Sequence, residues 1–97
     1  MWPPVVPTAV LVESITGRGP RDARVNRLLQ TCDVTGLDED LARRAATLRT
    51  FARKGSAVDA IVVATAEHKA CYLVLTSDDE DLAALAQHAR RVEIARI

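Results

Sequence analysis

Residues 72–82 read YLVLTSDDEDL, a near-continuous apolar run followed directly by a cluster of acids. The run from Tyr72 to Leu75 is typical of a strand that is buried on both faces of a parallel sheet. In open parallel sheets, ligands gather beyond the carboxyl ends of the strands, which is where these acids lie. This segment therefore predicts both a parallel sheet and the edge of that sheet at which a site would form.

The segments on either side of this strand complete an alternating pattern. Ser56, followed three residues later by Asp59, predicts a capping box that opens a buried helix to about His68. Asp38 is expected to cap a helix that runs to about Arg53. That helix has an apolar stripe at helical spacing, made of Leu41, Ala45, Leu48 and Ala52. Beyond the acids, we expect a helix over residues 81–90 and a strand over residues 91–97.

The first third of the chain predicts shorter elements. Val5 and Val6 indicate the end of a strand, and Thr8 is expected to cap a short helix that follows it. A second helix is expected to begin near Pro20, because proline suits the first helical turn. Residues 32–37 predict a short strand. The sequence of strand, helices, strand, helix and strand favours a parallel sheet between helical layers.

Length and composition agree with one α/β domain over residues 1–97, in three layers, α/β/α. The chain has 97 residues, of which 48% are hydrophobic and 27% charged, and these values exclude a disordered chain. No apolar run is long enough to span a bilayer, so no membrane partner is expected. Two cysteines without a disulfide framework indicate a reduced, cytoplasmic protein. Thirteen basic residues balance thirteen acidic ones, so no global field attracts nucleic acid.

Three acids from distant parts of the chain are candidate metal ligands. Asp78 follows the buried strand, Asp59 lies in the first turn of a buried helix, and Glu13 lies just after the first strand. A hard divalent cation such as Mg²⁺ or Mn²⁺ binds carboxylate oxygens and relieves the repulsion between clustered acids. Such a metal activates a bound water and stabilises charge on a phosphate. Phosphodiester hydrolysis at this edge would require no His, Cys or Ser nucleophile.

Each of these acids also has a simpler structural interpretation. Asp59 caps its helix with Ser56 in one interpretation, and residues 78–81 form a polar turn that opens a helix. Glu13 is then an ordinary glutamate on a helix surface. The sequence patterns alone leave these alternatives open.

A stripe of arginines recurs at intervals of three, at Arg18, Arg21, Arg24 and Arg27. Such a stripe is suited to contact RNA phosphates or an acidic protein partner. The simpler alternative is a solvated helix face. Neither interpretation is excluded by the sequence.

The order of these segments resembles the PIN domains, and within them the VapC-like toxins of bacterial toxin–antitoxin pairs. The resemblance is carried by residues 5–13 (VVPTAVLVE), 56–66 (SAVDAIVVATA) and 75–82 (LTSDDEDL). It covers nearly the whole chain in the order that the family has. It implies a Mg²⁺-dependent endoribonuclease with an acidic pocket at the carboxyl edge of a five-stranded parallel sheet, with Mn²⁺ as the other candidate ion.

The resemblance also assigns roles to individual residues. Glu13, Asp59 and Asp78 would be the catalytic acids that hold the metal. Thr76 would supply the hydroxyl beside them, and Asp81 would be an outer member of the cofactor site. The implied function is the toxin component of a type II toxin–antitoxin system, with an RNA substrate and a cognate antitoxin protein as partners.

The family pattern opens with a strand that ends in an aspartate, whereas this sequence begins at about the segment that matches residues 5–13. We therefore expect an N-terminally truncated domain, with nuclease activity weakened by the loss of that catalytic Asp. A missing central strand would leave backbone groups unpaired on two inner strand edges, at about 1–3 kcal/mol for each buried group. We expect a homodimer or another strand-supported oligomer to cover them. The alternatives are a non-catalytic PIN remnant that binds an antitoxin or itself, and an unrelated regulatory binding domain.

Overall fold

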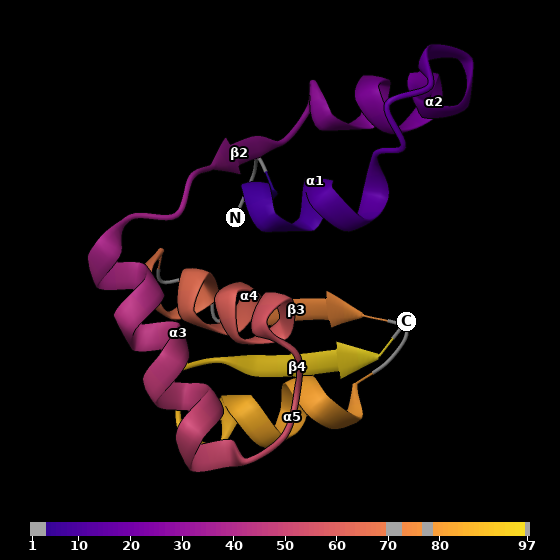
Figure 1. The fold of residues 1–97 in the computed structure, drawn as a ribbon. Coiled ribbons are helices and arrows are strands. Elements are labelled where there is room, and N and C mark those ends of the chain that lie inside the picture. Colours follow the sequence, from indigo (N-terminus) through magenta and orange to yellow (C-terminus); the bar gives the residue numbers. More distant parts are fainter. Residues whose placement is uncertain (1–3, 70–72, 77–78, 97) are drawn as a thin grey trace. The chain divides into compact units, whose positions relative to one another are not determined.

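The structure, a computed structural model, describes residues 4–69, 73–76 and 79–96. The chain divides into two units, Met1–Leu37 and Asp38–Ile97, and each is described by itself. Both units combine helices with parallel strands, so the predicted α/β class is confirmed (Figure 1). The expectation of one truncated domain over residues 1–97 stays a prediction. Within the described ranges, no helix has the length and apolar character needed to cross a membrane.

The helices and strands follow the order that the sequence predicts, with most bounds within a few residues. In the described part of the chain they are β1 (Val5–Pro7), α1 (Thr8–Ser14), α2 (Gly19–Leu29), β2 (Asp33–Thr35), α3 (Glu39–Ala52), α4 (Ala57–His68), β3 (Leu73–Thr76), α5 (Glu80–Ala86) and β4 (Glu93–Arg96).

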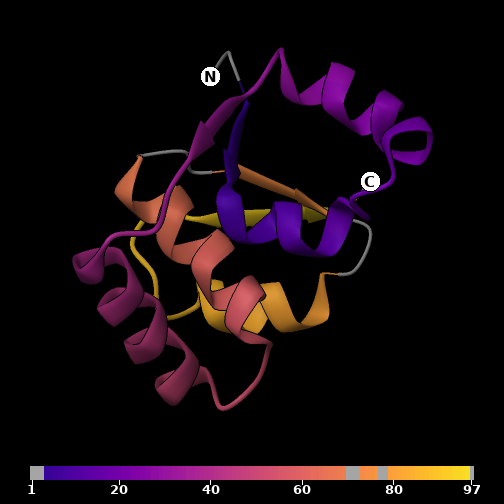
Figure 2. The ribbon, with the colours of Figure 1, turned by 45° about the horizontal axis from the view of Figure 1, so that its top comes forward.

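In the first unit, β1 and β2 lie side by side as a parallel pair, in a register that sets Val5 opposite Asp33 (Figure 2). Helix α1 follows β1 without a break. The expected cap at Thr8 is wrong by one residue: Pro7, at φ −64° and ψ 141°, is the N-cap, and Thr8 is the first helical residue. Because proline already holds an extended backbone that suits the N-cap position, the helix begins directly after it.

A buried carboxylate, Asp22, orders the turn that leads into α2. Its side chain is 4% exposed and accepts three hydrogen bonds of 2.9 Å, from the Thr16 N–H, the Thr16 hydroxyl and the Gly17 N–H. The bond from the Thr16 N–H lowers the pKa of Asp22, although burial acts in the opposite direction. The Asp22 carboxylate therefore accepts hydrogen bonds from the backbone N–H groups of Thr16 and Gly17 in the turn before α2.

The core of the second unit lies between α3, α4 and α5. Leu48, Val63 and Leu85 are fully buried there, one from each helix. The apolar stripe predicted for α3 is confirmed, because Ala45 is also buried and the other two members pack against this core. Burying a side chain of this size stabilises the fold by about 1.5–3 kcal/mol.

Strands β3 and β4 form the sheet of the second unit. They pair in parallel from Leu73↔Glu93 to Thr76↔Arg96, so both strands end at the same edge (Figure 1). The predicted strand over residues 72–75 is therefore present as β3, with its first residue, Tyr72, outside the described residues.

The loop between α3 and α4 closes onto α5 through Gly55. This residue has φ +90°, and a Cβ atom there would lie 2.7 Å from Leu85 Cδ1. Both the backbone conformation and the close approach require glycine. The loop consequently lies against α5, and Lys54 beside Gly55 pairs with Glu80 in the first turn of that helix.

Helix α5 ends at Ala86, earlier than the predicted end at residue 90. Its last turn tightens, with the His88 N–H donating to the Leu85 carbonyl at 3.1 Å. The next residues are then held from other helices: Arg44 donates to the His88 carbonyl at 3.2 Å, and the Arg90 N–H donates to Glu67 at 2.7 Å. Since these partners lie more than twenty positions away, local periodicity could not predict this end.

Candidate functional site

Polar side chains gather at the edge of the second unit where β3 and β4 end. Thr76 is the last residue of β3, and its ladder partner Arg96 ends β4. Helix α5 begins shortly after β3, with Asp79 as its N-cap and Glu80 and Asp81 in its first turn. The predicted location of a site beyond the carboxyl ends of the strands thus coincides with a set of described acids and one arginine.

Asp59 forms the predicted capping box at the start of α4. Its Oδ2 accepts a hydrogen bond from the Ser56 N–H, and its own N–H donates to Ser56 Oγ, each at 3.1 Å. The structural interpretation of this residue is therefore confirmed. A capping carboxylate has a second oxygen, so this role and a metal-binding role are compatible.

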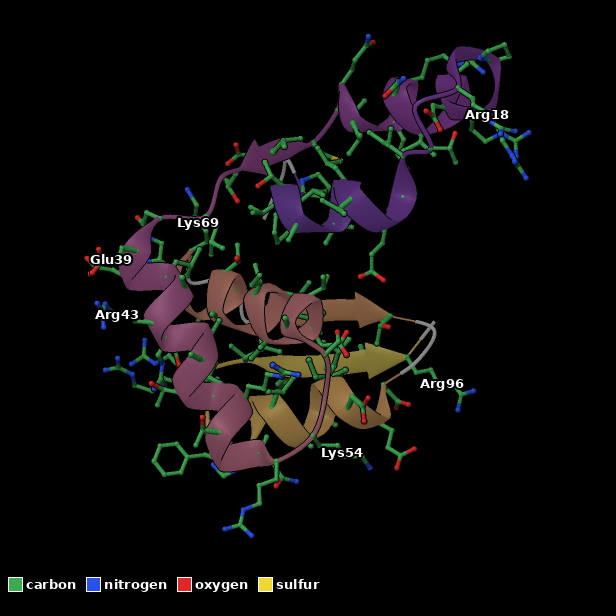
Figure 3. The ribbon with its side chains drawn as sticks, viewed as in Figure 1. Arg18, Glu39, Arg43, Lys54, Lys69 and Arg96 are labelled. Atoms are coloured by element: carbon green, nitrogen blue, oxygen red, sulfur yellow. The ribbon has the colours of Figure 1, made fainter. Side chains whose placement is uncertain are left out.

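Lys54 is a cation at this edge that the sequence analysis did not single out. Its Nζ lies 2.5 Å from Glu80 Oε1 and 4.0 Å from Asp81 Oδ1, and Figure 3 shows it reaching from the loop between α3 and α4 toward the start of α5. The hydrogen bond to Glu80 raises the pKa of Lys54, and the same contact lowers the pKa of Glu80. The ammonium group thereby neutralises part of the acidic cluster. The sequence around Lys54 does not predict this contact, because its partners, Glu80 and Asp81, lie more than twenty positions further along the chain.

The predicted acids are divided between the two units and a position outside the described residues. Glu13 is exposed on α1 and belongs to the first unit, whereas Asp59 and Asp81 belong to the second. Asp78 lies outside the described residues. The assignment of Glu13, Asp59, Asp78, Thr76 and Asp81 to one site stays a prediction.

The acids that are described do not by themselves build a metal site. Across residues 4–69, 73–76 and 79–96, no three His, Cys, Asp or Glu side chains lie close enough to hold an ion. The donor chemistry suits a hard cation, since the candidates are carboxylates and a hydroxyl. The predicted ligand set also includes Asp78, outside the described residues, and Glu13 of the first unit.

The opposite edge of the same sheet holds a different polar cluster. Arg44 Nε and Nη2 donate to the two oxygens of Glu67 at 2.7 and 2.9 Å, in a bidentate pair. These bonds from Arg44 lower the pKa of Glu67 against the effect of its burial. The pair lines an open hollow of about 1030 Å³ that Glu93, the first residue of β4, also borders. Both carboxylate oxygens of Glu67 accept hydrogen bonds, from Arg44 on α3 and from the N–H of Arg90. This cluster therefore holds α3, α4 and the segment before β4 together.

Comparison with protein families decides the ancestry of the chain. The PIN domain family matches residues 4–88, a span that contains β1, α4, β3 and all of the predicted site residues. The chain belongs to the PIN domain family. Neither the curated proteins nor the solved structures gave a match to it.

Membership of the family indicates the general class of chemistry. PIN domains are nucleases as a class and generally use divalent metal ions, so nuclease-type chemistry is indicated for this PIN domain as well. The edge where β3 and β4 end, with Thr76 and the first turn of α5, is the part of the described structure that corresponds to the expected site.

Proposed function

We propose that this PIN domain is a metal-dependent endoribonuclease and the toxin of a type II toxin–antitoxin pair of the VapC kind. The observation that carries the proposal is the family match over residues 4–88, because that span includes Glu13, Asp59 and Asp78. The carboxyl edge of β3 and β4 supports it further, since Thr76 and Asp81 lie there beside the start of α5.

In this proposal each residue of the chain has a defined task. Glu13, Asp59 and Asp78 would supply carboxylate oxygens for Mg²⁺ or Mn²⁺, and such an ion, when bound, would supply Lewis-acid activation of a water and charge stabilisation at the scissile phosphate. The capping box fixes the position of Asp59 at the start of α4. The Thr76 hydroxyl orients the water or a phosphate oxygen, and Asp81 acts at the rim of the site with Lys54 beside it.

RNA cleavage by site variants tests the proposal. The wild-type chain is incubated with RNA and Mg²⁺ or Mn²⁺, beside Asp59→Asn and Asp78→Asn. We expect each substitution to reduce cleavage by about 100-fold or more, because the site loses one carboxylate charge of a hard-cation set. Asp79→Asn is the matched control: Asp79 makes no capping hydrogen bond and is outside the proposed ligand set, so cleavage should persist. Cleavage that survives both site substitutions would refute the assignment.

The second candidate function is a non-catalytic PIN domain that binds an antitoxin or another copy of itself. One observation favours it: the first unit exposes large apolar side chains, with Val12 81% and Leu28 65% exposed. Absence of metal-dependent cleavage by a wild-type chain that is folded would select this candidate over the nuclease.

A further inference from the structure

Helix α2 and its N-cap carry every basic residue of the first 37 positions. These residues are Arg18, Arg21, Arg24 and Arg27. All four side chains are exposed, and Figure 3 shows Arg18 extending outward from the start of α2. At about 100° per residue, a spacing of three turns each arginine about 60° from the one before it, so Arg21, Arg24 and Arg27 follow one another around about a third of the helix circumference, with Arg18 at the N-cap before them. With a rise of 1.5 Å per residue, the four positions span about 13.5 Å along the axis.

The guanidinium groups of these arginines have no partner in the described part of the chain. Among residues 4–69, 73–76 and 79–96, none of the four guanidinium groups takes part in an ion pair or a hydrogen bond. In the second unit, three cations, Arg43, Arg44 and Lys54, each pair with a carboxylate. On α2, by contrast, no carboxylate of the described residues forms an ion pair with any of the four arginines.

The only acid within α2 does not neutralise this face. Asp22 is buried and turned toward the preceding turn, where its two oxygens accept the N–H groups of Thr16 and Gly17. The same turn is tied at its next residue, because the Arg18 N–H donates to Thr16 Oγ1 at 3.2 Å. The backbone that presents the first arginine is thus held in place, while the guanidinium groups stay free.

We propose that this face of α2 (Arg18, Arg21, Arg24 and Arg27) docks the phosphate backbone of single-stranded RNA. Guanidinium groups bind phosphate oxygens in a bidentate manner, and a surface with four cations and no exposed acid is complementary to a polyanion. A protein interface is centred on apolar side chains, whereas the exposed face of α2 offers Leu28 alone among large apolar residues. The inference rests on the proposed ribonuclease function for the identity of the nucleic acid, and it concerns binding rather than cleavage.

The salt dependence of RNA binding tests the inference. Binding of a short, mixed-sequence single-stranded RNA is measured by fluorescence anisotropy in EDTA, between about 50 and 200 mM salt. The triple variant Arg21→Gln, Arg24→Gln, Arg27→Gln should bind more weakly. The slope of log K against log salt should become shallower by about 2, since each lost phosphate contact contributes about 0.7. Circular dichroism checks that α2 remains folded, and Asp22 is left intact for that reason.

A matched variant separates the α2 face from total charge. Arg43→Gln, Arg49→Gln, Arg53→Gln removes three charges from α3 and its C-cap, and its salt slope should stay close to that of the wild type. An unchanged slope in the α2 variant, or an equal loss in both variants, would overturn the inference. So would loss of poly-glutamate binding without loss of RNA binding, because that result assigns the face to an acidic protein.

The two proposals fail separately. A wild-type chain that cleaves RNA while the α2 variant keeps its salt slope would retain the nuclease function and reject the docking face. A chain that binds RNA through α2 but does not cleave it with Mg²⁺ or Mn²⁺ would retain the docking face and reject the nuclease function.

Discussion

Asp59 has a structural task and a proposed chemical one. The capping box with Ser56 satisfies N–H groups at the start of α4, whereas a metal requires the negative charge of the carboxylate. Substitutions at the two members of the box distinguish these tasks, because only one of them removes the charge.

We predict that Ser56→Ala lowers the free energy of unfolding by about 1 kcal/mol, through loss of the hydrogen bond to the Asp59 N–H. RNA cleavage by this variant, assayed below its unfolding midpoint, should equal that of the wild type. Urea unfolding and cleavage are measured on the same preparations. Ser14→Ala, at the exposed end of α1, is the control for the chemical change itself. A loss of cleavage in Ser56→Ala as large as in Asp59→Asn would show that the cap, rather than the carboxylate, is what the activity requires.

At the scale of elements, the Arg44–Glu67 pair joins three parts of the second unit. Arg44 lies on α3 and Glu67 on α4, and the two also hold the backbone of His88 and Arg90 between α5 and β4. The Glu67 side chain is only 10% exposed and that of Arg44 33%, so removal of the charge of Glu67 leaves a half-buried cation without its acceptor.

This pair predicts an acid-dependent loss of stability. Hydrogen bonds from Arg44, and then from the Arg90 N–H, lower the pKa of Glu67 in the folded protein. Its contribution is therefore fully present above the unfolded pKa, near 4.3, and is lost as the pH falls through the lower folded value. Glu67→Gln should cost about 1–3 kcal/mol at neutral pH and should flatten the fall in stability below about pH 4.

Urea midpoints measured from about pH 6 to pH 3 check this prediction. Glu39→Gln is the matched control, because Glu39 pairs with Arg43 on the surface of α3 with both side chains more than three-quarters exposed. An exposed pair of this kind is expected to contribute less than about 0.5 kcal/mol. Equal losses in the two variants would contradict the role given to Glu67.

The elements that the sequence predicts correctly are those whose causes are local. Asp38 caps α3 through the Leu41 N–H at 2.8 Å, and the Ser56–Asp59 box opens α4, as the spacing of each pair indicates. The predicted end of α5 was wrong, because Arg44 on α3 and Glu67 on α4 form hydrogen bonds with the backbone of the segment that follows the helix. Lys54 was missed for the same reason, because Glu80 becomes its neighbour only after folding. The partners of Asp22, Thr16 and Gly17, are six and five positions away, and these bonds depend on the turn that the chain makes before α2.

For the candidate site, the sequence predicts the edge and the residue types, but not their convergence. Thr76 and Asp81 lie at the carboxyl edge of the sheet, as the position of the acids after an apolar strand indicates. Whether Glu13 reaches the same place depends on packing between segments separated by more than forty residues. No periodicity within one segment contains that information.

At the scale of the whole molecule, the account requires acids from both units to share one ion. Membership of the PIN family supports this, because the match spans both units. The arginine face of α2 would then give the first unit a second task, the docking of the RNA backbone. The central claim is therefore the proximity of Glu13 to Asp59 and Asp78.

Paramagnetic broadening by Mn²⁺ measures that proximity directly, without a need for turnover. Amide signals of the ¹⁵N-labelled chain are followed by NMR during addition of small amounts of Mn²⁺. We predict that signals around Glu13, Asp59 and Asp78 broaden together at the same Mn²⁺ concentration, and that Asp78→Asn weakens all three effects. Broadening confined to the first turn of α5, with the signals of Glu13 and Asp59 unaffected, would contradict the shared site.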